Sequence, residues 1–133
     1  MDEALRQLVR PRANHRCGYC LLSQQFAPIY RFHIEHIRAR KHGGNDGSDN
    51  LALACPNCNH HKGPNLSAVD PVSDDVVLLF NPRTQTWADH FETAETRIVG
   101  KTPTGRATVR LLIMNGDQRL RVRDALYERG EWP

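Results

Sequence analysis

The sequence lacks any long apolar run. The longest runs, at residues 51–55 and 76–80, are far shorter than the roughly 20 residues that span a membrane. The first 16 residues contain four Arg and no apolar stretch of the ~7–15 residues that a signal peptide needs. We therefore expect a soluble, cytoplasmic protein with no membrane partner.

Repeats, low-complexity tracts and the Gly-rich fingerprint of a nucleotide-binding fold are also missing. The 133 residues, of which 39% are apolar, fit one compact domain with a modest core and exclude a multidomain enzyme. Residues 67–133 hold no cluster of chemically functional side chains. We therefore expect a single domain over 1–133, with a functional core at 1–66 and a C-terminal extension at 67–133.

Charge is only weakly biased, with a net charge of +3. Residues 1–66 contain nine Lys and Arg against five Asp and Glu, whereas residues 67–133 contain nine against ten. The positive excess thus lies in the half that holds the cysteines and most of the histidines. An excess of this size is typical of a solvated surface, and by itself it supports nucleic-acid binding only weakly.

Four cysteines form two Cys-x-x-Cys pairs, Cys17 with Cys20 and Cys55 with Cys58. Cytosolic thiols stay reduced, so such pairs favour a tetrahedral zinc site over disulfides. A redox dithiol would use one pair and leave the other without a role, and an iron-sulfur cluster has a different spacing. The sequence therefore predicts one structural zinc, worth on the order of 10 kcal/mol in small zinc domains.

Periodicity predicts a mixture of helices and strands in the first half. Residues 2–9 have the spacing of a helix that Pro11 ends or kinks. Residues 32–37 alternate like a strand, and the apolar residues 51–54 follow a Gly-rich loop and pair back on it. The segment from Pro56 to Gly63 then predicts a short helix.

The C-terminal extension is expected to contain two strands and two helices. The strands are predicted over 76–80 and near 85–87, joined by a turn at 81–83, and the helices over 103–114 and near 117–129. We assign Trp87, Phe91 and residues 76–80 to the hydrophobic core.

Residues capable of chemistry are dense between the two cysteine pairs. They are His33-Ile-Glu35-His36-Ile37, Gly43-Gly44, Asn50-Leu51 and Cys58-Asn59-His60-His61-Lys62-Gly63, with 15 residues from Glu35 to Asn50 and nine from Asn50 to Asn59. This pattern resembles the HNH endonucleases, which are built on a ββα-metal (His-Me) finger. It is most similar to their zinc-bearing branch, in which Cys-x-x-Cys pairs bracket the active site. Residues 52–66, 79–91 and 104–112 also look like small stand-alone bacterial members of the family.

The resemblance implies a role for each motif residue. Glu35 takes the first metal-binding position and His36 that of the general base. Asn50 orients the loop, and Asn59 is the second metal ligand. Glu35 is longer than the usual Asp or His, and Asn59 replaces the His that names the motif. The implied fold is α+β, a zinc-stapled ββα-metal core with additional short strands and C-terminal helices.

Elementary chemistry agrees with these roles. Phosphodiester hydrolysis needs a base with a pKa near 7 and a cation that stabilises the phosphate charge. Carboxylate and amide oxygens suit Mg²⁺ or Mn²⁺, whereas four thiolates suit Zn²⁺. Because neighbours on a regular strand point to opposite faces, Glu35 and His36 can share a site only where the strand ends or twists.

Together these features predict a metal-dependent endonuclease that hydrolyses DNA, and the resemblance implies 3′-hydroxyl and 5′-phosphate ends as products. Phosphate contacts are expected from the basic residues nearest the motif, Arg38, Arg40, Lys41 and Lys62. His33, His60 and His61 are open to either a surface role or a substrate or metal contact. The alternative is a non-catalytic, zinc-containing nucleic-acid-binding module, which has no need of a base beside a carboxylate. A small-molecule redox enzyme is a third class with little support.

Overall fold

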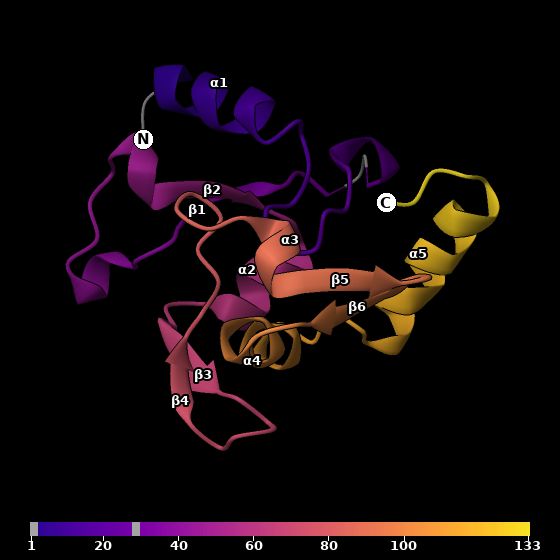
Figure 1. The fold of residues 1–133 in the computed structure, drawn as a ribbon. Helices are drawn as coiled ribbons and strands as arrows, with labels where there is room; N and C mark the ends of the chain where they lie inside the picture. Colours follow the sequence, from indigo (N-terminus) through magenta and orange to yellow (C-terminus); the bar gives the residue numbers. More distant parts are fainter. Residues whose placement is uncertain (1–2, 28–29) are drawn as a thin grey trace. The chain divides into compact units, whose positions relative to one another are not determined.

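The structure is a computed structural model that describes residues 3–27 and 30–133. Within these residues the chain is mixed α and β, with two-stranded antiparallel sheets, so the α+β prediction is confirmed (Figure 1). The elements are α1 (Glu3–Arg12), η1 (Gln24–Phe26), β1 (His33–His36), η2 (Arg40–His42), η3 (Ser48–Asn50), β2 (Leu51–Ala54), α2 (Pro56–Lys62), β3 (Ser67–Val69), β4 (Val76–Leu78), α3 (Trp87–His90), β5 (Phe91–Ala94), β6 (Arg97–Gly100), α4 (Pro103–Leu111) and α5 (Asp117–Glu128).

The chain folds as two units. The first contains the described residues up to Leu66 together with Asn81–Gln85, and the second contains Ser67–Phe80 and Thr86–Pro133. The sequence did not indicate that residues 81–85 join the first unit. No helix among the described residues has the length and apolar character needed to cross a membrane.

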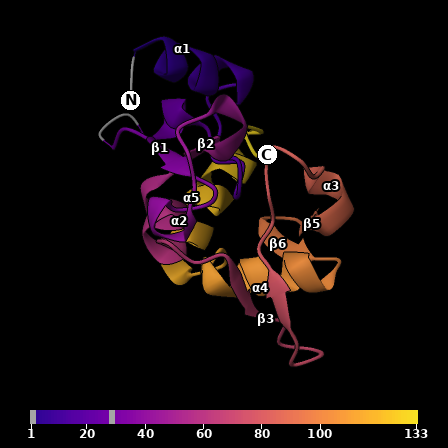
Figure 2. The same ribbon diagram turned by 90° about the vertical axis from the view of Figure 1, so that its left-hand side faces the viewer.

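The first unit contains a ββα arrangement. β1 pairs antiparallel with β2, with His33 opposite Ala54 and His36 opposite Leu51. β2 is buried along its whole length, and α2 follows it directly (Figure 2). α2 begins at Pro56 and ends before Gly63, as predicted, because Pro56 presets the first helical φ and the backbone N–H of Gly63 closes the last turn on the carbonyl of Asn59.

α1 extends further than predicted. Pro11 lies inside the helix, and the helix ends at Arg12. Of the residues expected in it, Asp2 lies outside the described part of the chain. The last turn is stabilised by tertiary contacts, because the Arg12 guanidinium donates to the carbonyls of Ser48 and Leu51, each at 2.6 Å. These contacts anchor α1 to the loop that enters β2.

The second unit contains the hairpins β3–β4 and β5–β6 with α3, α4 and α5. Two predictions were wrong here. Residues 85–87 do not form a strand, because Trp87 begins α3 and Phe91 begins β5. Residues 76–78 are not core, since Val76 is 71% and Leu78 69% exposed on a two-stranded hairpin, although Leu79 and Phe80 are buried. Phe91 is buried as expected, whereas Trp87 is only partly buried and lies outside the core.

Candidate zinc site and active site

The four cysteines come together in the first unit. All are buried, and their sulfur atoms lie within 4.8 Å of one another. The Sγ atoms of Cys20 and Cys55 are 3.7 Å apart. A zinc ion with Zn–S bonds of about 2.3 Å in tetrahedral geometry holds its sulfurs about 3.8 Å apart. The four cysteines are therefore positioned as a zinc site.

Each Cys-x-x-Cys pair forms a tight turn around this point. The backbone N–H of Cys20 points to the Sγ of Cys17 at 3.5 Å, and that of Cys58 points to the Sγ of Cys55 at 3.4 Å. Burial raises the pKa of the Cys17 and Cys58 thiols. A buried thiolate is therefore stable only beside a bound cation, and zinc supplies that positive charge.

The cysteine cluster is held against the ββα arrangement by both of its turns. The backbone N–H of Gly18 donates to the carbonyl of Leu53 in β2 at 2.8 Å. A Cβ on Gly18 would lie 3.2 Å from the Cβ of Pro82, so the segment 81–85 covers this turn closely. Cys55 is the N-cap of α2, so the second turn also sets the start of the helix.

A hollow of about 460 Å³ lies beside the end of β1. It is lined by His33, Ile34, Glu35, His36, Ala39, Arg40, Asn59, Gly63 and Pro64. β1 ends at His36, which is the condition under which Glu35 and His36 can both reach one site. The structure thus brings Glu35, His36 and Asn59 to one hollow, and Asn50 lies outside its lining.

Glu35 is buried in a polar cluster. The Tyr19 hydroxyl donates to its Oε1, and the Lys62 ammonium lies 3.2 Å from its Oε2. Burial raises the pKa of Glu35, and the ammonium of Lys62 opposes that effect. Each carboxylate oxygen has two lone pairs, so both retain acceptor capacity toward the hollow. Tyr19 was not identified from the sequence, although its place between Cys17 and Cys20 put it next to the predicted metal site.

Lys62 is a buried partner of Glu35, and the prediction that it contacts phosphate receives no support from its position. Its side chain is 2% exposed. The ammonium also donates to the carbonyls of His36 at 3.3 Å and Ile37 at 2.9 Å. Lys62 therefore holds the end of β1 in place, because one cation satisfies a carboxylate and two backbone acceptors there.

We expect Lys62→Met to destabilise the protein by about 3–5 kcal/mol at neutral pH, because it leaves the Glu35 carboxylate buried without its cation. The raised pKa of Glu35 means that the native state binds more protons than the unfolded state, so stability falls as pH rises above about 4.5 toward that pKa. Removing Lys62 should raise the pKa of Glu35 further and so enlarge this loss of stability with rising pH. Denaturant unfolding measured from pH 4 to 7 checks it.

The control is Lys41→Met, which removes an exposed lysine from the same unit. It should leave the unfolding free energy nearly unchanged. Adding Glu35→Gln to Lys62→Met should recover stability at neutral pH, because the buried charge is gone. A Lys62→Met protein as stable as Lys41→Met across this pH range would show that the ion pair does not support the fold.

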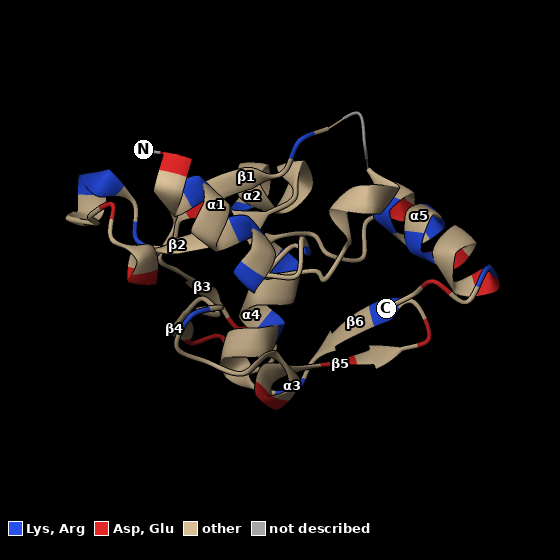
Figure 3. Ribbon diagram, turned by 90° about the horizontal axis from the view of Figure 1, so that it is seen from above, with Lys and Arg blue, Asp and Glu red and all other residues tan. Residues whose placement is uncertain are grey.

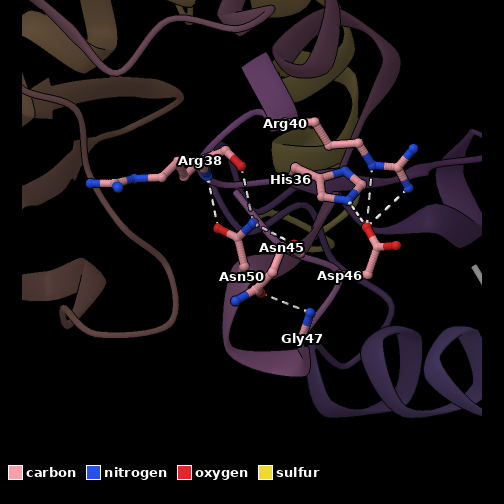
Figure 4. A network of polar contacts seen from close by, with 7 residues as sticks. All are labelled: His36, Arg38, Arg40, Asn45, Asp46, Gly47 and Asn50. Carbon is pink, nitrogen blue, oxygen red and sulfur yellow. Dashed lines mark hydrogen bonds and ion pairs between the residues drawn. The ribbon is translucent and has the colours of Figure 1, made fainter. Parts of the chain in front are cut away.

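His36 is held by a carboxylate from the Gly-rich loop. Its Nε2 lies 2.7 Å from Oδ1 of Asp46, and Arg40 donates to the same oxygen through Nη2 at 2.9 Å (Figure 4). These two partners lower the pKa of Asp46. His36 Nδ1 has no hydrogen-bond partner among residues 3–27 and 30–133. Asp46 was not identified from the sequence, where it lies in an unremarkable turn sequence ten residues after His36.

Asn50 holds the two ends of this loop together. Its Oδ1 accepts from the backbone N–H of Arg38 at 2.8 Å, and its Nδ2 donates to the carbonyls of Arg38 at 3.0 Å and Asn45 at 2.8 Å (Figure 4). This geometry is that of a side chain that orients a loop. Asn50 therefore fixes where the loop leaves β1 and returns to β2.

The remaining motif residues differ in their access to the hollow. Asn59 and His33 line it, whereas His60 and His61 do not. The Asn59 side chain has no hydrogen-bond partner among the described residues, so its amide oxygen is available. The other basic residues predicted to contact phosphate, Arg38, Arg40 and Lys41, are exposed.

Comparison with known protein families gives a match over the segment that holds this site. Residues 17–65 match the family model described as HNH endonuclease. That segment holds both cysteine pairs, β1, β2, α2 and every residue that lines the hollow. No curated protein and no solved structure matched the chain. The match indicates a nuclease-type function on nucleic acid. Residues 17–65 therefore resemble the HNH endonuclease family, and the four cysteines, positioned as a zinc site, are consistent with its zinc-bearing branch.

Proposed function

We propose that this protein is a metal-dependent endonuclease that hydrolyses DNA phosphodiester bonds. The observation that carries the proposal is the hollow shared by His36, Glu35 and Asn59. It places an imidazole, which Asp46 holds, beside a carboxylate and an amide without a hydrogen-bond partner among the described residues. A base and oxygen ligands for a cation are the groups that phosphodiester hydrolysis requires. The family match of residues 17–65 supports the same reaction class.

His36 is the general base in this proposal. When Nε2 carries the proton and donates to Asp46, the second ring nitrogen, Nδ1, keeps its lone pair. Nδ1 then accepts a proton from water, and Asp46 stabilises the imidazolium that forms. Arg40 keeps Asp46 ionised, because it donates to the oxygen that His36 uses.

Glu35 and Asn59 would hold the divalent ion. Their donor set of one carboxylate and one amide oxygen fits Mg²⁺ or Mn²⁺. Such an ion supplies stabilisation of the charge on the phosphate and on the departing 3′ oxygen. Lys62 and Tyr19 orient the Glu35 carboxylate from the buried side. Bond cleavage on the 3′-oxygen side leaves a 3′-hydroxyl and a 5′-phosphate.

One observation favours a second function, a non-catalytic nucleic-acid-binding module. Both Glu35 oxygens already have partners in Tyr19 and Lys62, as they would in a site that had become purely structural. Incubation of supercoiled plasmid with Mg²⁺, Mn²⁺ or EDTA separates the two functions. If the protein is an endonuclease, the plasmid should become nicked or linear with a divalent ion and stay supercoiled with EDTA. DNA binding without cleavage under all conditions predicts the module.

We expect Asp46→Asn to lower the cleavage rate on the order of tenfold, because the imidazole loses the acceptor that sets its tautomer and orientation. Plasmid nicking rates measured at saturating divalent ion check this. Asp49→Asn is the matched control, since it removes the same charge from an exposed position of the same loop. Equal rates for Asp46→Asn and Asp49→Asn would show that the contact with His36 does not position the base.

A further inference from the structure

A second hollow lies on the first unit, and three of the six residues that line it are arginines. Its walls are Arg6, Arg10, Arg31, Phe32, His33 and Ile34, and its volume is about 330 Å³. Arg6 and Arg10 are four residues apart on α1 and so share one face of the helix. Arg10 links α1 to the residue just before β1, because its Nη2 donates to the carbonyl of Phe32 at 3.0 Å.

Positive charge in this hollow has little compensation. Arg6 lies 3.9 Å from Glu3, and both side chains are exposed. Among the described residues, this is the only ion pair that the three arginines form. Burial and the neighbouring Arg31 and Arg6 lower the pKa of Arg10. The buried Nε of Arg10 has no hydrogen-bond partner among the described residues. Figure 3 shows the basic residues of α1 in blue and its acidic start in red.

The arginine hollow adjoins the candidate active site. His33 and Ile34 line both hollows, so β1 forms a wall that the two share. From His33 to His36 the strand advances about 10 Å at roughly 3.3 Å per residue. One DNA strand advances about 3.4 Å per nucleotide, so this distance corresponds to about three nucleotides. Arg6 and Arg10 precede the segment that matches the family, so the match does not account for them.

We infer that Arg6, Arg10 and Arg31 form a binding site for backbone phosphates of the nucleic acid that flank the phosphodiester bond in the active site. Guanidinium groups bind phosphate oxygens through paired N–H donors, and three of them around one hollow match a polyanion. The inference rests on the proposed function, because that function places the cleaved bond in the hollow beside His36. It adds a contact surface on α1 that positions the substrate, separate from the residues that carry the chemistry.

The test compares Arg6→Gln and Arg31→Gln with Arg83→Gln. Arg83 is exposed in the same unit and lines neither hollow. Binding of a short fluorescein-labelled DNA duplex is measured in EDTA over roughly 50 to 200 mM salt, so the readout does not depend on cleavage. Each hollow variant should flatten the plot of log K against log salt by about 0.9, and the double variant by about twice that. Arg83→Gln should keep the wild-type slope.

Steady-state cleavage gives a second readout. Arg31→Gln should raise KM and leave kcat unchanged, because the contact is made equally in the ground and transition states. Wild-type slope and KM in the Arg6→Gln and Arg31→Gln variants, with folded protein confirmed by circular dichroism, would overturn the inference. Flattened slopes in a protein that cleaves no DNA would support the phosphate site and overturn only the proposed endonuclease.

Discussion

His36→Ala is expected to lower the rate of plasmid cleavage by about 10²–10⁴-fold, the usual contribution of a general base. The variant should still fold and bind DNA, because the His36 side chain is partly exposed and its polar contact is with the loop carboxylate of Asp46. Single-turnover nicking of supercoiled plasmid at saturating Mg²⁺ measures the effect. The zinc content should match that of the wild type, since no cysteine contacts the imidazole.

His60→Ala is the matched control. It removes an exposed imidazole from α2 that does not line the hollow, so it should cleave at the wild-type rate. If His36→Ala nicks plasmid as fast as His60→Ala, His36 is not the base. His33, which also lines the hollow, then becomes the next candidate.

Asn59→Ala distinguishes loss of a metal ligand from loss of the base. It should slow cleavage through weaker binding of the divalent ion, with partial rescue at high Mn²⁺, whereas His36→Ala should show no rescue. The double variant should be little slower than the slower single variant, because base and metal serve one transition state and their losses do not add. Fully multiplicative losses would indicate that the two residues act independently.

Removal of the zinc ligands is expected to have the largest effect on stability. The wild-type protein should contain one equivalent of zinc, and Cys→Ala at any of the four positions should destabilise the first unit. Binding worth on the order of 10 kcal/mol exceeds the total stability of many small domains, so the loss should be unfolding of this unit. Elemental analysis and thermal unfolding with and without chelator measure both effects.

Ser23→Ala provides a matched control, because it changes a buried side chain of similar size in the same unit. It should keep its zinc and unfold near the wild-type temperature. Less than about half an equivalent of zinc in folded wild-type protein would contradict the assignment. A quadruple Cys→Ala variant that unfolds cooperatively at the wild-type temperature would do the same.

The sequence predicted the first unit well where the signals are local. Pro56 and Gly63 mark the ends of α2, and the alternation before the Gly-rich loop marks β1, because caps and side-chain periodicity depend on neighbouring residues. The two Cys-x-x-Cys spacings predicted the cysteine cluster, since each turn presents two sulfurs to one point. In the second unit, the β5–β6 hairpin was missed because its stability depends on packing, which periodicity alone does not report.

By itself the sequence determined the ligand set of the zinc site, the ββα order and the position of an imidazole next to a carboxylate. Only the tertiary structure decided how those groups are used. It buried Lys62 against Glu35, placed Tyr19 on the same carboxylate and brought Asp46 to His36. These partners are separated by ten or more residues along the chain. Contacts of that kind depend on where the loop and helix return in space, and no local propensity encodes that position.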